Sequence, residues 1–99
     1  MAADTVRLDV SVVVYRTDYR ILDPTLDSLG RALEYAARCG ILAAAALYLV
    51  DNNPDDRERL RLQQQLARTQ VKCRSLALQG EVISGHGNIG YGAGHNLVP

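Results

Sequence analysis

The chain has 99 residues, of which 47% are hydrophobic, and its 11 basic and 11 acidic side chains give a formal net charge of zero at pH 7. This length suits one domain with a single modest core, and the hydrophobic content argues against intrinsic disorder. The balanced charge gives no overall attraction to nucleic acid or to an anionic membrane, so we expect no nucleic-acid partner.

The apolar segments of the chain are too short for a membrane-spanning helix. The longest of them, Ile41 to Val50, has ten residues, whereas a spanning helix needs roughly 20. The first residues also lack the basic and apolar regions of a secretory signal, which predicts a cytoplasmic protein. In that compartment Cys39 and Cys73 are expected to be free thiols, and two isolated cysteines do not make a metal site.

The first two predicted elements are a strand and a helix. Residues 8–15 are rich in β-branched side chains and become continuously apolar, which predicts a strand buried on both faces. Asp23 as N-cap and Pro24 as first residue then begin a helix that ends near Gly40. Gly30, inside this helix, predicts close packing against a neighbour. The apolar residues at helical spacing are Leu22, Leu26, Leu29, Leu33 and Ala36.

The second half of the chain continues the alternation. Residues 46–50 predict a second buried strand, which is followed by the turn residues Asp51-Asn52-Asn53-Pro54. A second helix of about 14 residues is expected to begin there, with Asn53 as its cap and Pro54 as its first residue. The later pattern predicts a strand over residues 71–78, then a turn at Gln79 and Gly80, then an extended segment over 81–84. A third helix is expected over residues 93–98.

This order of strands and helices predicts an α/β fold. We expect a three-layer α/β/α sandwich with a mostly parallel sheet and right-handed crossovers, formed by residues 1–99 as one domain. Ligands of such sheets bind outside the carboxyl ends of the strands. Three segments should therefore meet at one end of the sheet: residues 15–17, 51–53 and 88–96.

A glycine-rich segment near the end of the chain is the strongest candidate for a ligand loop. Residues 85–94 contain five of the eight glycines, and Gly85, Gly87 and Gly90 match the dinucleotide-binding pattern Gly-x-Gly-x-x-Gly. That pattern normally follows the first strand and precedes an acidic residue, whereas here it comes third. His86 and His95 have no carboxylate nearby in the sequence, so we predict no metal site for them. Asp51 either ends its strand or accepts a hydrogen bond from a base or ribose.

Three motifs together resemble the N-terminal part of family-2 glycosyltransferases, most closely the rhamnosyltransferase-like members. The motifs are Asp9-Val10-Ser11-Val12-Val13-Val14-Tyr15, Leu49-Val50-Asp51-Asn52-Asn53 and Asn88-Ile89-Gly90-Tyr91-Gly92-Ala93-Gly94-His95-Asn96. Their order and approximate spacing match the family over nearly the whole chain. The resemblance implies the N-terminal half of a GT-A, Rossmann-like fold that binds a nucleotide-sugar donor.

The resemblance also implies which residues contact the nucleotide. Tyr15 and its neighbours would line the base pocket, Asp51 would bind the base or ribose, and the segment from Asn88 to Asn96 would lie against the nucleotide. The candidate nucleotide-binding residues are Tyr15, Arg16, Thr17, Asp51, Asn52, Asn88, Gly90, Tyr91, Gly92 and Asn96. No catalytic residue and no metal ligand are assigned to this chain.

Enzymes of the family transfer a sugar with inversion, using a divalent cation (Mg²⁺ or Mn²⁺) on the diphosphate and a carboxylate base on the acceptor hydroxyl. Their metal-binding Asp-x-Asp and their base lie downstream of the residues present here. The turns also depart from the family pattern, since Asn53-Pro54 replaces Gly-Ser and Tyr15-Arg16-Thr17 replaces Thr-Tyr-Asn.

We therefore expect an inactive fragment, truncated before the Asp-x-Asp motif, whose cut sheet favours self-association. The parent enzyme would act at the cytoplasmic side, including the inner face of the membrane, and would transfer a sugar such as rhamnose to a polysaccharide or glycolipid acceptor. Two alternatives stay open: a nucleotide-binding module without catalysis, and a fragment of an NAD-dependent oxidoreductase.

Overall fold

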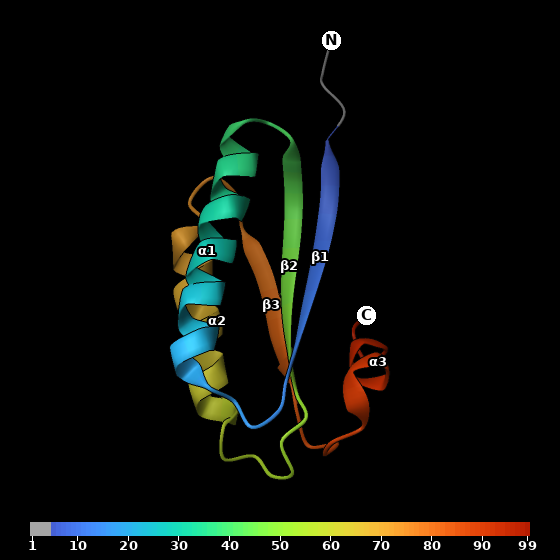
Figure 1. The fold of residues 1–99 in the computed structure, drawn as a ribbon. Coiled ribbons are helices and arrows are strands. Elements are labelled where there is room, and N and C mark those ends of the chain that lie inside the picture. Colours follow the sequence, from blue (N-terminus) through green and yellow to red (C-terminus); the bar gives the residue numbers. More distant parts are fainter. Residues whose placement is uncertain (1–4) are drawn as a thin grey trace.

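A computed structural model describes residues 5–99, in which strands and helices alternate along the chain (Figure 1). The strands are β1 (Val6–Val14), β2 (Leu42–Asp51) and β3 (Leu78–Ile83). The helices are α1 (Tyr19–Arg38), α2 (Arg59–Lys72) and α3 (Gly90–His95).

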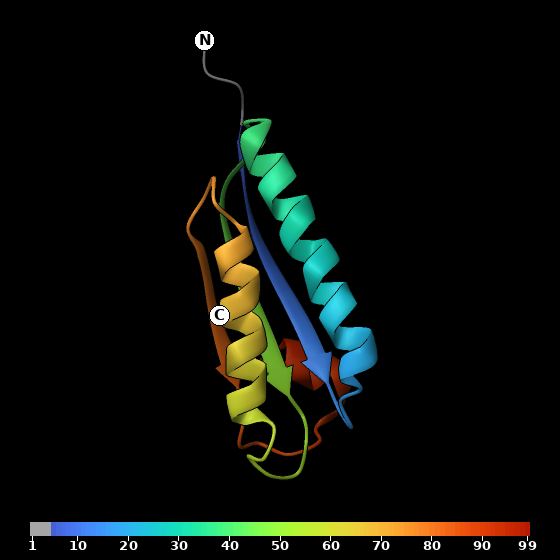
Figure 2. The same ribbon diagram turned by 90° about the vertical axis from the view of Figure 1, so that its left-hand side faces the viewer.

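The strands form a parallel sheet in the order β1-β2-β3. The register places Leu49 of β2 opposite Val12 of β1 and Val82 of β3. Helices α1 and α2 cover one face of the sheet, and α3 packs on the other face near the carboxyl ends of the strands (Figures 1 and 2). The predicted three-layer α/β/α arrangement with a parallel sheet is thereby confirmed.

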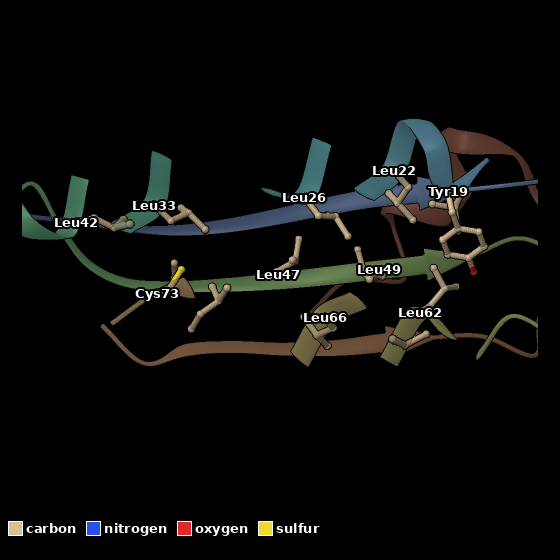
Figure 3. Packing of buried hydrophobic residues seen from close by; sticks show 14 residues of the cluster. Tyr19, Leu22, Leu26, Leu33, Leu42, Leu47, Leu49, Leu62, Leu66 and Cys73 are labelled. Carbon is tan, nitrogen blue, oxygen red and sulfur yellow. The ribbon is translucent and has the colours of Figure 1, made fainter. Parts of the chain in front are cut away.

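The core lies between the sheet and the two longer helices (Figure 3). Leu47 and Leu49 of β2 are fully buried there, and Leu26 of α1 and Leu62 of α2 pack toward them. Strand β2 has a neighbour on each side, so its backbone is shielded at both edges as well as on the helical face. The end of β2 is consequently the most enclosed position in the fold at which a polar side chain could lie.

The first helix begins earlier than the sequence predicted. Asp18 is the N-cap, because its carboxylate accepts a hydrogen bond from the backbone N–H of Arg20 at 3.0 Å. Asp23 and Pro24 lie inside α1, so their assignment as cap and first residue was wrong. Both patterns are typical helix starts, and the tight turn that follows β1 favours the earlier one.

The second helix begins later than predicted, at Arg59. Residues 52–58 form the connection from β2, and the Asn53 side chain bonds to the turn after β1 instead of capping α2. The expected packing of Gly30 against a neighbour is confirmed, since a Cβ atom there would lie 3.4 Å from Thr69 Cγ2 of α2.

The prediction for residues 71–84 was wrong in its boundaries. Val71 is part of α2, and Gln79 and Gly80 lie within β3 rather than in a turn. A Cβ atom on Gly80 would come within 2.6 Å of Leu66 Cδ1 and 2.7 Å of the Leu47 carbonyl oxygen. Glycine at this position therefore lets α2 approach the sheet closely.

The remaining expectations concern the third helix, the thiols and the membrane. Helix α3 begins at Gly90, three residues before the predicted start at Ala93. Cys39 is exposed and Cys73 is buried, and both are free thiols as predicted. Over residues 5–99, none of the helices has both the length and the apolar character that crossing a bilayer requires.

Candidate functional site at the carboxyl end of the sheet

The segments that follow the three strands meet at one end of the sheet, as the parallel arrangement predicts (Figure 1). Asn53, after β2, accepts a hydrogen bond from the Arg16 backbone N–H at 2.7 Å and donates one to Thr17 Oγ1 at 3.3 Å. Asn52 donates from Nδ2 to the Gly90 carbonyl oxygen, after β3, at 3.1 Å. Neighbouring asparagines thus connect the end of β2 to the other two segments.

Asp51 is fully buried at the end of β2. Its Oδ1 atom accepts hydrogen bonds from the Asn53 backbone N–H at 2.9 Å and from Asn53 Nδ2 at 2.7 Å. Its Oδ2 atom is also buried and has no hydrogen-bond partner among the described residues. Buried carboxylate oxygens are normally hydrogen-bonded, so Oδ2 is an acceptor that a ligand donor could satisfy.

Asn52 and His86 form a second, part-buried contact on the side of the sheet that carries α3. Asn52 is 1% exposed, and its Oδ1 lies 2.7 Å from His86 Nε2. Because Asn52 Nδ2 donates to Gly90, Asn52 Oδ1 must accept, and His86 therefore carries its proton on Nε2. His86 Nδ1 is buried and has no hydrogen-bond partner among residues 5–99.

The glycine-rich segment turns sharply before it enters α3. Gly85, Gly87 and Gly90 have φ angles of +88°, +71° and +80°, which glycine adopts without strain. The Asn88 side chain accepts a hydrogen bond from the Gly90 backbone N–H at 3.1 Å within this segment. The segment leads into α3, which has six residues and no side-chain cap at its start.

Helix α3 is held against β1 by small side chains. A Cβ atom on Gly94 would lie 3.2 Å from both methyl groups of Val13, so the helix backbone rests directly on the strand. His95 Nδ1 hydrogen-bonds the Ser11 hydroxyl on the same face. Gly92 faces open space, and Asn96, the C-cap of α3, is exposed.

A groove of about 360 Å³ runs along the carboxyl half of β1, between α1 and Tyr91. The predicted residues Tyr15, Arg16, Thr17 and Tyr91 line it, whereas the buried Asp51 and Asn52 are not among its lining residues. The other lining residues are Val12, Val13, Val14, Asp18, Ile21, Leu22 and Thr25. The wall from α1 was not predicted, because the helix was expected to begin only at Asp23.

Charged and aromatic groups surround the mouth of this groove. The Arg16 guanidinium lies 5.4 Å from the centre of the Tyr15 ring, and Arg16 has a φ angle of +50°. Hydrogen bonds from Arg20 lower the pKa of the Asp18 carboxyl below its ordinary value. Asp18 is thus an anion at neutral pH, and its carboxylate is paired with the Arg20 guanidinium at 3.1 Å.

Tyr19 connects the start of α1 to the approach to α2. Its hydroxyl donates to Glu58 Oε2 at 2.6 Å, and the Arg61 guanidinium lies 3.6 Å from the centre of its ring. Burial and then the hydrogen bond to Glu58 raise the pKa of the Tyr19 hydroxyl well above its ordinary value. These contacts join the start of α1 to the start of α2.

Two residues that contribute to this end of the sheet were not among the predicted site residues, namely Asn53 and His86. Asn53 was interpreted as a helix cap, and His86 had no partner that its sequence neighbours could reveal. Within residues 5–99 no cluster of three or more histidine, cysteine, aspartate or glutamate side chains could hold a metal ion. The resemblance places the ligands of the family's divalent cation downstream of these residues, and we assign no metal ligand among them.

Comparisons with protein-family models, with curated proteins and with solved structures found no match to this chain. The function must accordingly be inferred from the chemistry at the carboxyl end of the sheet.

Proposed function

We propose that this chain binds the nucleoside diphosphate part of a nucleotide sugar, as the donor-binding part of a glycosyltransferase. The observation that carries the proposal is the buried Asp51 carboxylate, whose Oδ2 atom has no hydrogen-bond partner among residues 5–99. The imide N–H of uracil or thymine and a ribose hydroxyl are donors that match such an acceptor. The three-motif resemblance supports the same assignment.

The groove beside Asp51 has groups suited to the rest of a nucleotide. Tyr15 and Tyr91 lie on its border with 40% and 66% of their surface exposed, so either ring can stack on a base. Arg16 supplies a positive charge for a phosphate at the same border. Asp51 is fully buried and does not line the groove, so on this proposal the base reaches Oδ2 when the turn of residues 15–17 moves outward.

The proposal extends to the parent enzyme. A divalent cation and a catalytic base from outside this chain would complete a sugar transfer, with rhamnose as one candidate sugar and a polysaccharide or lipid-linked saccharide as acceptor. The proposed setting is the cytoplasm, including the inner face of the membrane, where nucleotide sugars and lipid-linked acceptors meet.

Calorimetric titration with UDP, dTDP and NAD, each with and without Mn²⁺, tests the proposal. We expect UDP or dTDP to bind in preference to NAD, and to bind without Mn²⁺. Asp51→Asn should weaken this binding at least about tenfold, since it replaces a carboxylate acceptor by an amide. Asp56→Asn, at an exposed position near the start of α2, is the matched control and should bind normally.

A second variant keeps the test decisive if Asp51→Asn fails to fold. Tyr91→Ala removes an exposed ring from the border of the groove, so folding is not at risk. It should weaken nucleotide binding through lost stacking. Preferential binding of NAD, or unchanged binding in both Asp51→Asn and Tyr91→Ala, would overturn the proposal.

A further inference from the structure

The outer face of the two longer helices carries basic side chains beside exposed apolar ones. Residues 59–74, which comprise α2 and the two residues after it, contain no acidic side chain. Tyr35 of α1 and Val71 of α2 are 65% and 73% exposed. The chain as a whole has no net charge, so the positive charge of this face is a local property. The basic residues of the segment are Arg59, Arg61, Arg68, Lys72 and Arg74.

The C-terminal halves of α1 and α2 lie side by side over the same face of the sheet (Figures 1 and 2). Gly30 of α1 faces Lys72 of α2, because a Cβ atom on Gly30 would lie 3.5 Å from Lys72 Cβ. Farther along, the Glu34 carboxylate accepts hydrogen bonds from the Ser75 backbone N–H and hydroxyl, each at 2.7 Å. The core residues of both helices point toward the sheet, so the exposed residues of these halves form one surface that faces away from it.

Three guanidinium groups on this surface are available to an external anion. Lys72 forms an ion pair with Asp27, whereas Arg31, Arg68 and Arg74 are exposed and form no ion pair with another of residues 5–99. A shallow groove of about 360 Å³ lies among Ala67, Arg68, Val71 and Lys72. We call the surface the basic patch and define it as Arg31, Tyr35, Arg68, Val71, Lys72 and Arg74.

We propose that the basic patch binds the surface of an anionic lipid bilayer, with α1 and α2 lying parallel to the membrane plane. The guanidinium groups would bind lipid phosphates. Tyr35 and Val71 would enter the region between the headgroups and the acyl chains. Binding of this kind leaves the helices on the bilayer surface and requires no membrane-spanning segment.

The composition of the patch favours lipid over nucleic acid. Proteins that bind nucleic acid through its backbone contact many phosphates, roughly 6–10 of them. The patch offers three unpaired guanidinium groups, and the carboxylates of Asp27 and Glu34 lie beside them. Tyr35 is its single aromatic ring, whereas proteins that bind single strands stack successive bases on several rings. Exposed tyrosine and valine beside arginine instead suit the boundary between water and lipid.

The patch is separate from the proposed nucleotide site. None of its residues lines the groove along β1. On α1 that groove ends at Thr25, whereas the patch begins at Arg31. Membrane binding can therefore be tested without any nucleotide, and a negative result in one test leaves the other proposal standing.

Co-sedimentation with lipid vesicles tests the proposal. We expect the chain to bind vesicles made of equal parts of phosphatidylglycerol and phosphatidylcholine at least about tenfold more tightly than vesicles of phosphatidylcholine alone. Binding should weaken as salt is raised, because salt screens the charges at the membrane surface. Failure to bind the anionic vesicles, or a higher affinity for a single-stranded oligonucleotide than for these vesicles, would overturn the proposal.

Two matched double variants locate the binding surface. Arg31→Glu/Arg68→Glu reverses two charges of the patch and should weaken binding to the anionic vesicles at least about tenfold. Arg57→Glu/Arg59→Glu changes the net charge equally, but outside the patch, and should weaken binding much less. All four arginines are exposed, so circular dichroism should show both variants folded. Equal losses in the two variants would contradict binding through the patch.

A tryptophan in the patch tests insertion into the lipid. The chain has no tryptophan, so a single introduced ring reports its own surroundings. The emission of Tyr35→Trp should shift to shorter wavelength on anionic vesicles, because the ring leaves water. Ile89→Trp, at an exposed position just before α3, is the control and should keep its emission. An unchanged emission of Tyr35→Trp on vesicles that bind the chain would contradict the proposed contact.

Discussion

Two polar segments meet at the carboxyl end of the sheet: residues 51–53, which follow β2, and residues 85–95, which follow β3. The first is buried: the Asn53 side chain donates to Asp51 and also bonds the turn after β1. The second is mostly exposed and is held by Asn52, Gly94 and His95. The comparison shows that one predicted site can combine two kinds of segment. Residues 51–53 are buried and hydrogen-bonded, whereas residues 85–95 are mostly exposed and contact the sheet at few positions.

The physical cause of this difference lies in the positions of the strands. Strand β2 lies between two neighbours, so residues at its end leave water and must find hydrogen bonds inside the protein. The segment after β3 leaves an edge strand, crosses to the other face and stays in contact with water. Its backbone groups need fewer hydrogen-bond partners within the protein. Its glycines allow the sharp turns of the segment and add little to stability.

The largest effect that would test this comparison is expected from Asn53→Ala. The change removes the acceptor of the Arg16 N–H and one of the two donors to Asp51 Oδ1, both at the enclosed end of β2. We expect a loss of about 3 kcal/mol in the free energy of unfolding, measured by urea denaturation. Asn96→Ala, at the exposed end of α3, should change it by less than about 0.5 kcal/mol. Equal effects of the two variants would contradict the proposed difference between the segments.

A smaller effect is expected from the glycines of α3. Gly94→Leu places a side chain where Val13 already lies, and overpacking of this kind costs about 1–3 kcal/mol. Gly92→Ala enters open space and should be neutral or stabilising by up to about 1 kcal/mol. Hydrogen exchange should show α3 loosened in Gly94→Leu, while the amides of β2 stay protected. Loss of protection in β2 would mean that residues 85–95 stabilise residues 51–53.

The smallest effect is expected from Tyr19, whose hydroxyl donates a hydrogen bond to Glu58 just before α2. The pKa of Tyr19 is raised in the folded protein, whereas an unfolded tyrosine loses its proton near pH 10. The unfolded state therefore releases the proton first as the pH rises, and stability should fall above about pH 10. Denaturation at several alkaline pH values should show this fall in the unchanged chain and less of it in Tyr19→Phe. Tyr35→Phe, whose ring is 65% exposed, should keep the original pH dependence.

Much of the fold could be predicted because its signals are local. The apolar run before Asp51 lies in a buried strand, and the apolar stripe of α1 faces the core. The run before Tyr15 also forms a strand, but only Val13 and Val14 of it are buried, so the prediction of a first strand buried on both faces was wrong. The errors arose where two local signals competed. Asp18 and Asp23 both resemble helix caps, and Gly80 resembles a turn residue although it fills a close contact with Leu66.

The sequence by itself determined the alternation of strands and helices, the parallel sheet and the three segments that gather at its carboxyl end, because hydrophobic periodicity and turn residues act over a few neighbours. Only the tertiary structure decided that Asn53 bonds Arg16 and that His86 bonds Asn52. It also decided that Asp51 keeps an unbonded buried oxygen. Such contacts join residues far apart in the chain, and their geometry is set by how the strands and helices pack, which local pattern does not record.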